Sequence, residues 1–285
     1  MTATAATTTP STVAQALAAA VALGVDRLDA QLLLLHALGR APHDRAWLLA
    51  HDTDAISDAA WSALAAQLSR RLAGEPVAYL LGEKEFHGLG LQVDARVLVP
   101  RPDTETLVDW ALQCLEGRKA PRVLDLGTGS GAIALALQHA RPDAQVDAVD
   151  ASADALAVAQ ANAQRLGLPV RLRQAHWLDG AASGYAAIAS NPPYIAAGDP
   201  HLPALQHEPL AALVAGPDGL ADIRQIVQQA PAHLADGGWL LLEHGHDQAL
   251  PVRQLLEARG FAEVQSRDDL AGIQRCSGGI WRTVK

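Results

Sequence analysis

Cysteine is nearly absent: the chain has two, Cys114 and Cys276, among 285 residues. Two cysteines so far apart fit neither a disulfide framework nor the ligand spacing of a structural zinc site. We therefore expect two reduced thiols and no metal centre. His244 and His246 flank a glycine, but with no third ligand in view they do not predict a metal site either.

Positive charge is also scarce, with 22 Lys and Arg against 31 Asp and Glu and a formal net charge of −9. Proteins that bind nucleic acids usually present a basic face, so we expect no direct nucleic-acid binding. The first arginine is Arg27, and the opening residues lack the basic region of a signal peptide. We expect residues 1–10, which are small and polar, to form a disordered tail.

Long hydrophobic runs are missing as well. The longest apolar stretches, such as Ala30–Leu38, are too short and too interrupted to span a bilayer. The sequence therefore predicts no membrane association and a cytoplasmic protein. Hydrophobic residues still make up 49% of the chain, which is enough to bury a sizeable core.

Residues 11–74 have the pattern of a small helical bundle. Asp26 is placed to cap a helix over Arg27–Leu38, and Ser57 is placed to cap another that runs to Ala73. Trp47 and Trp61 are expected in the core of this N-terminal helical domain. Residues 75–100 alternate and are broken by glycines, which predicts a β-hairpin linker.

Residues 101–285 alternate between short apolar strands and helices, which indicates an α/β domain with a doubly wound parallel sheet. The expected strands are Arg122–Asp125, Gln145–Val149, Val170–Gln174, Ala186–Ala189, Trp239–Glu243, Phe261–Ser266 and Gly279–Val284. A helix is expected over about 219–235.

A glycine-rich turn follows the first of these strands, in the run Asp125-Leu-Gly127-Thr128-Gly129-Ser130-Gly131. The glycines let a ligand approach the bare backbone. Asp150 ends the next strand, where an acidic side chain can bind two ribose hydroxyls. Both NAD and S-adenosylmethionine use such an acid. The glycine spacing departs from the dinucleotide fingerprint, and Asp125 is well placed for the charged methionine end of S-adenosylmethionine.

A second unusual stretch, Ser190-Asn191-Pro192-Pro193-Tyr194, follows the fourth strand. Ligands bind at the carboxyl ends of the strands in such sheets, so this loop is expected to face the cofactor's methyl group. The side-chain carbonyl of Asn191 and the backbone carbonyl of Pro192 can accept both hydrogens of a planar NH₂ group. Pro193 stiffens the loop, and Tyr194 can pack on the flat group. Orientation and electrostatics would then supply the catalysis.

The Asp125–Gly131 run resembles the first motif of class I S-adenosylmethionine-dependent methyltransferases, whose fold is a Rossmann-like sheet with an antiparallel last strand. The Asn-Pro-Pro-Tyr loop is similar to those of DNA adenine-N6 and protein glutamine-N5 methyltransferases. Further stretches favour the second group, the bacterial peptide chain release factor glutamine methyltransferases. They are Gly74–Leu80, Val99–Glu105, His207–Leu210 and Leu240–Gly245.

This resemblance covers residues 11–285 and implies a substrate, the glutamine of the Gly-Gly-Gln motif in class I release factors. It implies that Gly127–Gly131 holds the methionine part of S-adenosylmethionine, Asp150 the ribose and Trp177 the adenine region. Asn191–Tyr194 would hold the glutamine amide, and the helical domain would help to dock the release factor.

The chain departs from the family at His176, where an Asp is usual before Trp177. A neutral His could accept a hydrogen bond from the adenine amino group in one tautomer only. The roles of Arg101, Asp103 and Glu208 stay open between site residues and ordinary turn or loop residues. Two other functions also remain: a DNA adenine-N6 methyltransferase, and a non-catalytic module that binds release factors or ribosomes.

Overall fold

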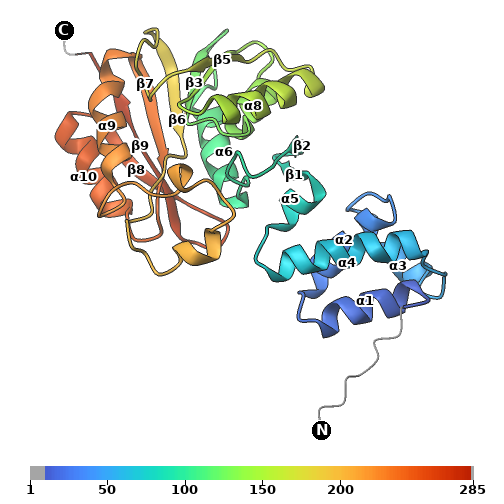
Figure 1. Cartoon of the computed structure of the whole chain (residues 1–285). Coiled ribbons are helices and arrows are strands. Elements are labelled where there is room, and N and C mark those ends of the chain that lie inside the picture. The colour runs from blue at the N-terminus through green and yellow to red at the C-terminus, as the bar shows by residue number, and fades with distance from the viewer. Residues whose placement is uncertain (1–9, 284–285) are drawn as a thin grey trace. The chain divides into compact units, whose positions relative to one another are not determined.

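The computed structural model describes residues 10–283 and divides into two compact units after Gly82 (Figure 1). The tail expected over residues 1–10 therefore falls almost wholly outside the described residues. The expected strand Gly279–Val284 likewise has its last residue outside them.

The first unit is the helical bundle that the sequence predicts. Its helices are α1 (Val13–Ala22), α2 (Arg27–Ala37), α3 (Arg45–Ala50), α4 (Asp58–Leu72) and α5 (Val77–Leu81). Oδ1 of Asp26 accepts from the backbone N–H of Leu28 at 2.8 Å, and the hydroxyl of Ser57 accepts from the N–H of Ala60 at 3.2 Å. These caps satisfy backbone donors that have no partner within their helices.

Leucines of α2 and α4 fill the core of this unit, and the two tryptophans lie at its edge. Trp47 and Trp61 are half-buried rather than central. The Trp47 ring stacks on His51 at 4.2 Å between centroids, with the guanidinium of Arg40 over it at 3.7 Å. An indole ring that also contacts polar groups is accommodated more readily at the rim of a small bundle than inside it.

The segment expected to form the linker is split between the two units. Residues Val77–Leu81 form α5 and pack in the helical bundle, where Leu80 is buried. The hairpin itself is shorter than expected: β1 (Glu83–Phe86) pairs with β2 (Leu89–Gln92) and belongs to the second unit. Phe86 and Leu91 anchor it in that unit's core.

The second unit holds a seven-stranded sheet of order β5-β4-β3-β6-β7-β9-β8. The strands are β3 (Arg122–Leu126), β4 (Gln145–Asp150), β5 (Arg171–Gln174), β6 (Tyr185–Ser190), β7 (Leu234–Glu243), β8 (Ala262–Asp268) and β9 (Gln274–Trp281). The helices are α6 (Glu105–Cys114), α7 (Ala132–Ala140), α8 (Ala153–Leu166), α9 (Ala221–Gln229) and α10 (Ala249–Arg259). The strands from β5 to β7 are parallel, and β9 is antiparallel to both neighbours.

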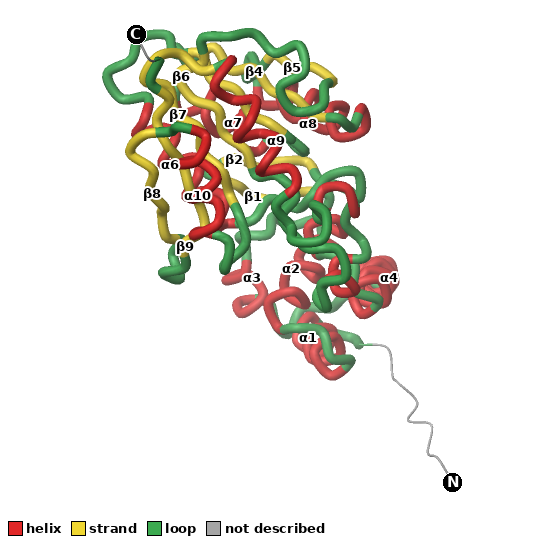
Figure 2. The backbone as a smooth tube through the Cα atoms, turned by 90° about the vertical axis from the view of Figure 1, so that its left-hand side faces the viewer, coloured by secondary structure: helices red, strands yellow, loops and turns green. Residues whose placement is uncertain are grey.

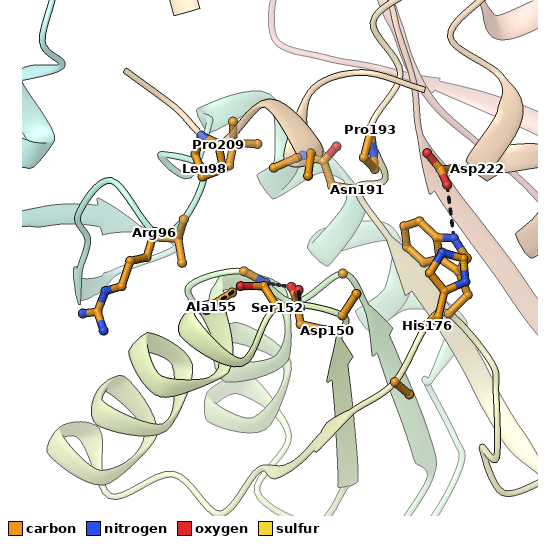
Figure 3. Close-up of a pocket in the computed structure, with 18 residues that line it drawn as sticks. Arg96, Leu98, Asp150, Ser152, Ala155, His176, Asn191, Pro193, Pro209 and Asp222 are labelled. Carbon is orange, nitrogen blue, oxygen red and sulfur yellow. Dashed lines mark hydrogen bonds between the residues drawn. The ribbon is translucent and has the colours of Figure 1, made fainter. Parts of the chain in front are cut away.

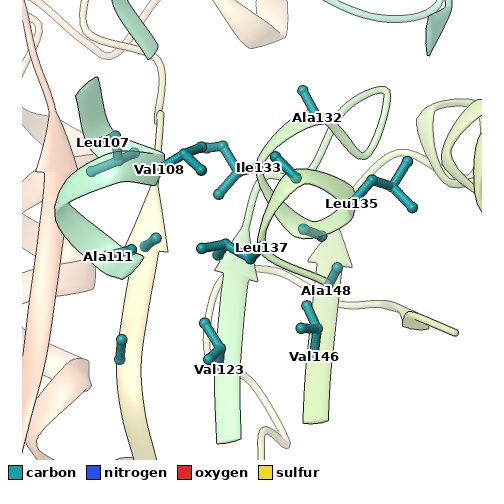
Figure 4. Close-up of a cluster of buried hydrophobic side chains, with 14 of the residues drawn as sticks. Leu107, Val108, Ala111, Val123, Ala132, Ile133, Leu135, Leu137, Val146 and Ala148 are labelled. Atoms are coloured by element: carbon teal, nitrogen blue, oxygen red, sulfur yellow. The ribbon is translucent and has the colours of Figure 1, made fainter. Parts of the chain in front are cut away.

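Helices cover both faces of this sheet, which Figure 2 traces with strands in yellow and helices in red. Side chains of α6 and α7 pack on one face, and Figure 4 shows Leu107, Ile133 and Leu137 on these helices in the same buried cluster as Val123 on β3. Side chains of α9 and α10 cover the other face. Every residue of β6 is buried, as a central strand covered on both sides requires.

The helix expected over about 219–235 is shorter in the structure. The α-helix ends at Gln229, one 3₁₀ turn covers Ala230–Ala232, and β7 already begins at Leu234. Pro231 accounts for the difference, because it has no N–H to continue the helix. Within residues 10–283, no helix has the length and apolar character needed to cross a membrane.

Candidate active site

The glycine-rich turn joins β3 to α7 at the carboxyl edge of the sheet. Gly127 and Gly129 have φ of +68° and +54°, in the left-handed region that favours glycine. A Cβ atom on Gly127 would lie 3.3 Å from the ring of Trp177, whereas one on Gly129 would enter open space. The backbone at Gly129 therefore has open space beside it, whereas Gly127 is packed against Trp177.

Asp125 lies beneath the turn and is fully buried. Its Oδ2 accepts from the hydroxyl of Thr128 at 2.6 Å and from the backbone N–H of Ala134 at 3.1 Å. Burial raises the pKa of this carboxyl group to about 7. Asp125 does not line the cavity described below. Its two hydrogen bonds hold the turn from beneath. A contact of Asp125 with the charged methionine end of a cofactor stays a prediction.

Asp150 ends β4 and faces the same turn. Its Oδ2 accepts from the backbone N–H of Gly129 at 2.9 Å, and its Oδ1 accepts from the N–H of Ser152 at 2.9 Å. A carboxylate has about four acceptor positions, so sites remain for two hydroxyl groups. The acid thus lies at the edge of the cavity that the turn borders.

Trp177 forms an apolar wall beside Gly127. Its Nε1–H donates to Oδ1 of Asp222, at the start of α9, over 3.2 Å. His176 also lines the cavity, with its Nδ1 3.3 Å from Nε2 of Gln225. Asp222 lines the cavity too, so an acidic acceptor is present near His176 although it comes from a different element.

These groups surround a cavity of about 430 Å³. Figure 3 shows Asn191 and Pro193 on the opposite side of it from Asp150 and Ser152. A volume of this size is typical of sites for small molecules and cofactors. Six of the site residues predicted from the sequence line it: Gly127, Gly129, Asp150, Trp177, Asn191 and Pro193. Thr128, Ser130 and Gly131 lie in the turn without lining it, and Ser130 and Thr128 are buried.

The Asn-Pro-Pro-Tyr loop begins where β6 ends. The hydroxyl of Ser190 donates to the carbonyl of Leu126 at 2.7 Å and ties the two strand ends together. The Nδ2 group of Asn191 donates to the hydroxyl oxygen of Thr104 at 3.2 Å, which leaves Oδ1 available as an acceptor. Pro192 is buried. Nε2 of Gln248 donates to the backbone carbonyl of Tyr194 at 3.0 Å and fixes the far end of the loop.

A second cavity of about 360 Å³ adjoins the loop. Asn191, Leu98 and Ala212 line both cavities, and Tyr194 lines only the second. Arg101 and Glu208 also line the second cavity, where Arg101 forms an ion pair with Glu208. Glu208 is buried and also accepts from the backbone N–H of Val99 at 3.0 Å. The carboxyl group of Glu208 therefore ties its own loop to residues 99–101. Asp103 instead lies 3.6 Å from Arg275.

The sequence pattern did not single out four polar residues that lie around the site: Thr104, Asp222, Glu243 and Gln248. Glu243 ends β7 next to the loop and occurs in a stretch that carried the family resemblance. Of the His244–His246 pair, His244 is buried and hydrogen-bonds to Ser277 and to the carbonyl of Gly245. Residues 10–283 contain no group of three side chains arranged to hold a metal ion.

The parallel sheet, the glycine turn with its acid and the cavity at the strand ends define a class I methyltransferase domain. Residues 104–208 match the family model described as a methyltransferase small domain. The fold also resembles the Thermus thermophilus 16S rRNA N2 G1207 methyltransferase in complex with AdoMet and guanosine. That match has a TM-score of 0.54 and 21% identity, and covers 70% of this chain and 50% of the other.

Curated relatives define the family more narrowly. The release factor glutamine methyltransferase of Bordetella pertussis is 54% identical over 90% of this chain and 95% of the relative. The release factor glutamine methyltransferase of Burkholderia pseudomallei is 48% identical over 95% of this chain and 96% of the relative. Residues 11–82 match the model of the PrmC N-terminal domain. The chain belongs to the release factor glutamine methyltransferase family.

Proposed function

We propose that this enzyme transfers a methyl group from S-adenosylmethionine to the side-chain amide nitrogen of a glutamine in class I peptide chain release factors. The proposed glutamine is that of the Gly-Gly-Gln motif. The products are N5-methylglutamine, S-adenosylhomocysteine and the proton that the amide nitrogen releases to water. The observation that carries the proposal is the position of Asn191, which lines both the cavity of the glycine turn and the adjoining one. The proposed compartment is the cytoplasm.

The residues of the first cavity fit the proposed cofactor. Gly127–Gly131 would hold the methionine part, Asp150 the two ribose hydroxyls, and Trp177 the adenine region. The open space at Gly129 and the remaining acceptor positions of Asp150 support this assignment. S-adenosylmethionine, when bound, supplies an electrophilic methyl group.

The second cavity would take the glutamine side chain. An amide nitrogen is a poor nucleophile because its lone pair is delocalised into the carbonyl group. Oδ1 of Asn191 and the backbone carbonyl of Pro192 would accept its two hydrogens and aim the nitrogen at the methyl group. Tyr194, which is half-buried in the wall, would pack on the flat amide. Rate acceleration would then come from the orientation that these two acceptors give to the substrate amide.

The helical unit would dock the release factor. Support comes from its match to the PrmC N-terminal domain over residues 11–82. A DNA adenine-N6 methyltransferase would need a basic channel for the phosphates, and the net charge of −9 speaks against it.

The test offers the purified chain methyl-labelled S-adenosylmethionine with three acceptors: a class I release factor, the same factor with Ala in place of the Gly-Gly-Gln glutamine, and adenine-containing DNA. We expect label only on the unchanged release factor, located on that glutamine by peptide mass spectrometry. Label on DNA alone, or equal label on both release factors, would overturn the proposal. The absence of any transfer would leave the non-catalytic module as the better description.

A further inference from the structure

One end of the first cavity carries an acidic group to which the proposed function gives no role. Asp222 is the second residue of α9, and among the described residues that line this cavity only Asp150 is also acidic. Figure 3 shows Asp222 and His176 together at one end of the cavity, with Arg96 at the opposite end. The acid at this end is therefore available to a part of the ligand that Asp150 does not hold.

Trp177 fixes one oxygen of Asp222 and leaves the other. The indole N–H donates to Oδ1 of Asp222 over 3.2 Å. Trp177 has a φ of +46°, a conformation that is unusual for a bulky residue and persists only where the surroundings hold it. No other hydrogen bond to the Asp222 carboxylate is present within residues 10–283. Oδ2 of Asp222 thus stays available as an acceptor for a ligand.

His176 offers the cavity a donor rather than an acceptor. Nε2 of Gln225 lies 3.3 Å from Nδ1 of His176, and an amide NH₂ group can only donate. Nδ1 is then the acceptor, so the neutral ring has its hydrogen on Nε2. The amino group of adenine also carries hydrogens and needs an acceptor. His176 therefore does not replace the Asp that is usual before Trp177 in the family.

We propose that Asp222 is a specificity-determining residue that accepts a hydrogen bond from the 6-amino group of the adenine of S-adenosylmethionine. This inference rests on the proposed function, in which Trp177 holds the adenine region. The acidic acceptor comes from α9 in this chain instead of from the position before Trp177. An ionised carboxylate only accepts, so a 6-oxo group in place of the amino group would face Asp222 with no hydrogen between the two oxygens. The site therefore selects adenine over hypoxanthine.

Binding of two product analogues tests this role without any methyl transfer. S-adenosylhomocysteine carries the amino group, and its deaminated form, S-inosylhomocysteine, carries a 6-oxo group. Calorimetry on the full chain should show that the wild type binds S-adenosylhomocysteine at least about 30-fold more tightly, since leaving a charged acceptor unpaired is costly. His176→Ala should keep a preference of at least about tenfold, because the acceptor lies on α9.

Asp222→Asn should reverse this preference. The Trp177 N–H still needs an acceptor, so the Asn side chain keeps its oxygen toward Trp177 and presents its NH₂ group to the cavity. The Kd for S-adenosylhomocysteine should rise about tenfold or more, while the Kd for S-inosylhomocysteine should fall. The matched control is Asp154→Asn, because Asp154 is the second residue of α8, is exposed and does not line the cavity. Its two Kd values should stay within about twofold of the wild type.

A second variant separates recognition of the amino group from support of Trp177. Asp222→Ala removes the acceptor without supplying a donor, so it should bring the two Kd values within about threefold of each other without reversing them. If Asp222→Asn weakens both ligands by the same factor, or changes neither, Asp222 does not bind the amino group and the inference is overturned. Loss of the preference in His176→Ala, with Asp222→Asn still selective for adenine, would overturn it as well.

Methyl transfer gives a separate readout of the proposed function. If Asp222→Asn reverses the preference while the wild type leaves release factors unmethylated, the proposed function fails and adenine recognition by Asp222 stands. If release factors are methylated on the Gly-Gly-Gln glutamine but the two Kd values ignore Asp222→Asn, the proposed function stands and the inference fails.

Discussion

Tyr194 and Gly219 meet through their backbones: a Cβ atom on Gly219 would overlap the carbonyl oxygen of Tyr194 and lie 2.7 Å from Nε2 of Gln248. That carbonyl is the one that Gln248 holds at 3.0 Å. The loop that carries Asn191 is therefore packed so closely at its far end that no side chain fits against it.

We expect Gly219→Ala to displace this loop and to lower kcat about tenfold or more, because methyl transfer tolerates little misplacement of Asn191. The matched control is Gly198→Ala, since Gly198 has a similar positive φ of +88° but open space where its Cβ would lie. Steady-state kinetics of both variants measure the difference. Equal losses would show that backbone strain, rather than the contact with Tyr194, limits turnover.

Asn191→Ala removes the acceptor shared by the two cavities. We expect kcat to fall about 100-fold or more, in the range observed when one preorganised hydrogen-bonding group is removed from an active site. The Kd for S-adenosylmethionine, measured by calorimetry, should rise only a few-fold, since the glycine turn and Asp150 are untouched. Retained turnover would mean that Asn191 does not clamp the substrate.

Asp125 should make the folded unit less stable as pH rises. Its pKa is raised from 3.8 to about 7 in the folded protein, so between about pH 4 and 7 the unfolded chain has released a proton that the folded chain keeps. The free energy of unfolding then falls by up to about 1.4 kcal/mol per pH unit from this group.

Asp125→Asn retains an oxygen acceptor for Thr128 and removes the titration. Urea unfolding at several pH values should show that the stability of this variant, relative to the wild type, improves from pH 4 to 7. Glu257→Gln serves as the control and should track the wild type. If the free energy of unfolding changes with pH in the same way for Asp125→Asn and the wild type, the expected titration of Asp125 is wrong.

The ion pair of Arg101 and Glu208 should support both stability and the second cavity. Glu208→Ala leaves the N–H of Val99 without its acceptor and Arg101 without its partner, at a cost of about 2 kcal/mol in the free energy of unfolding. The KM for the release factor should rise. Glu208→Gln keeps an acceptor for Val99 and should lose less stability. If neither variant changes KM, the pair supports the fold alone.

The alternation of strands and helices predicted the sheet of the larger unit well, because buried parallel strands have continuous apolar runs that stand out in a sequence. Asp150, Gly129 and Asn191 were predictable for a related reason. Each ends or follows a strand, and parallel strands bring their carboxyl ends to one edge. The end of the helix after Gly219 was not predictable in the same way. Pro231 ends that helix early, and β7 begins before the residue expected for it.

The positions of Thr104 and Glu243 beside the loop could not be predicted from the sequence pattern. Thr104 lies 87 residues from Asn191 along the chain, and its contact depends on how α6 packs. In the sequence, Glu243 has the pattern of an ordinary acidic residue at the end of a strand. Only its burial behind Tyr194 distinguishes it, and burial of a polar residue is a property of the assembled tertiary structure.

The place of β9 has a consequence for synthesis of the chain. This strand is inserted between β7 and β8, and its Cys276 pairs in register with Glu243. While a nascent chain still lacks residues 274–281, β7 has an unpaired edge, and Cys276 is not yet there to pair with Glu243 at the end of β7. Translation must therefore pass this strand before the sheet behind the loop is complete, although the helical unit can already have been made.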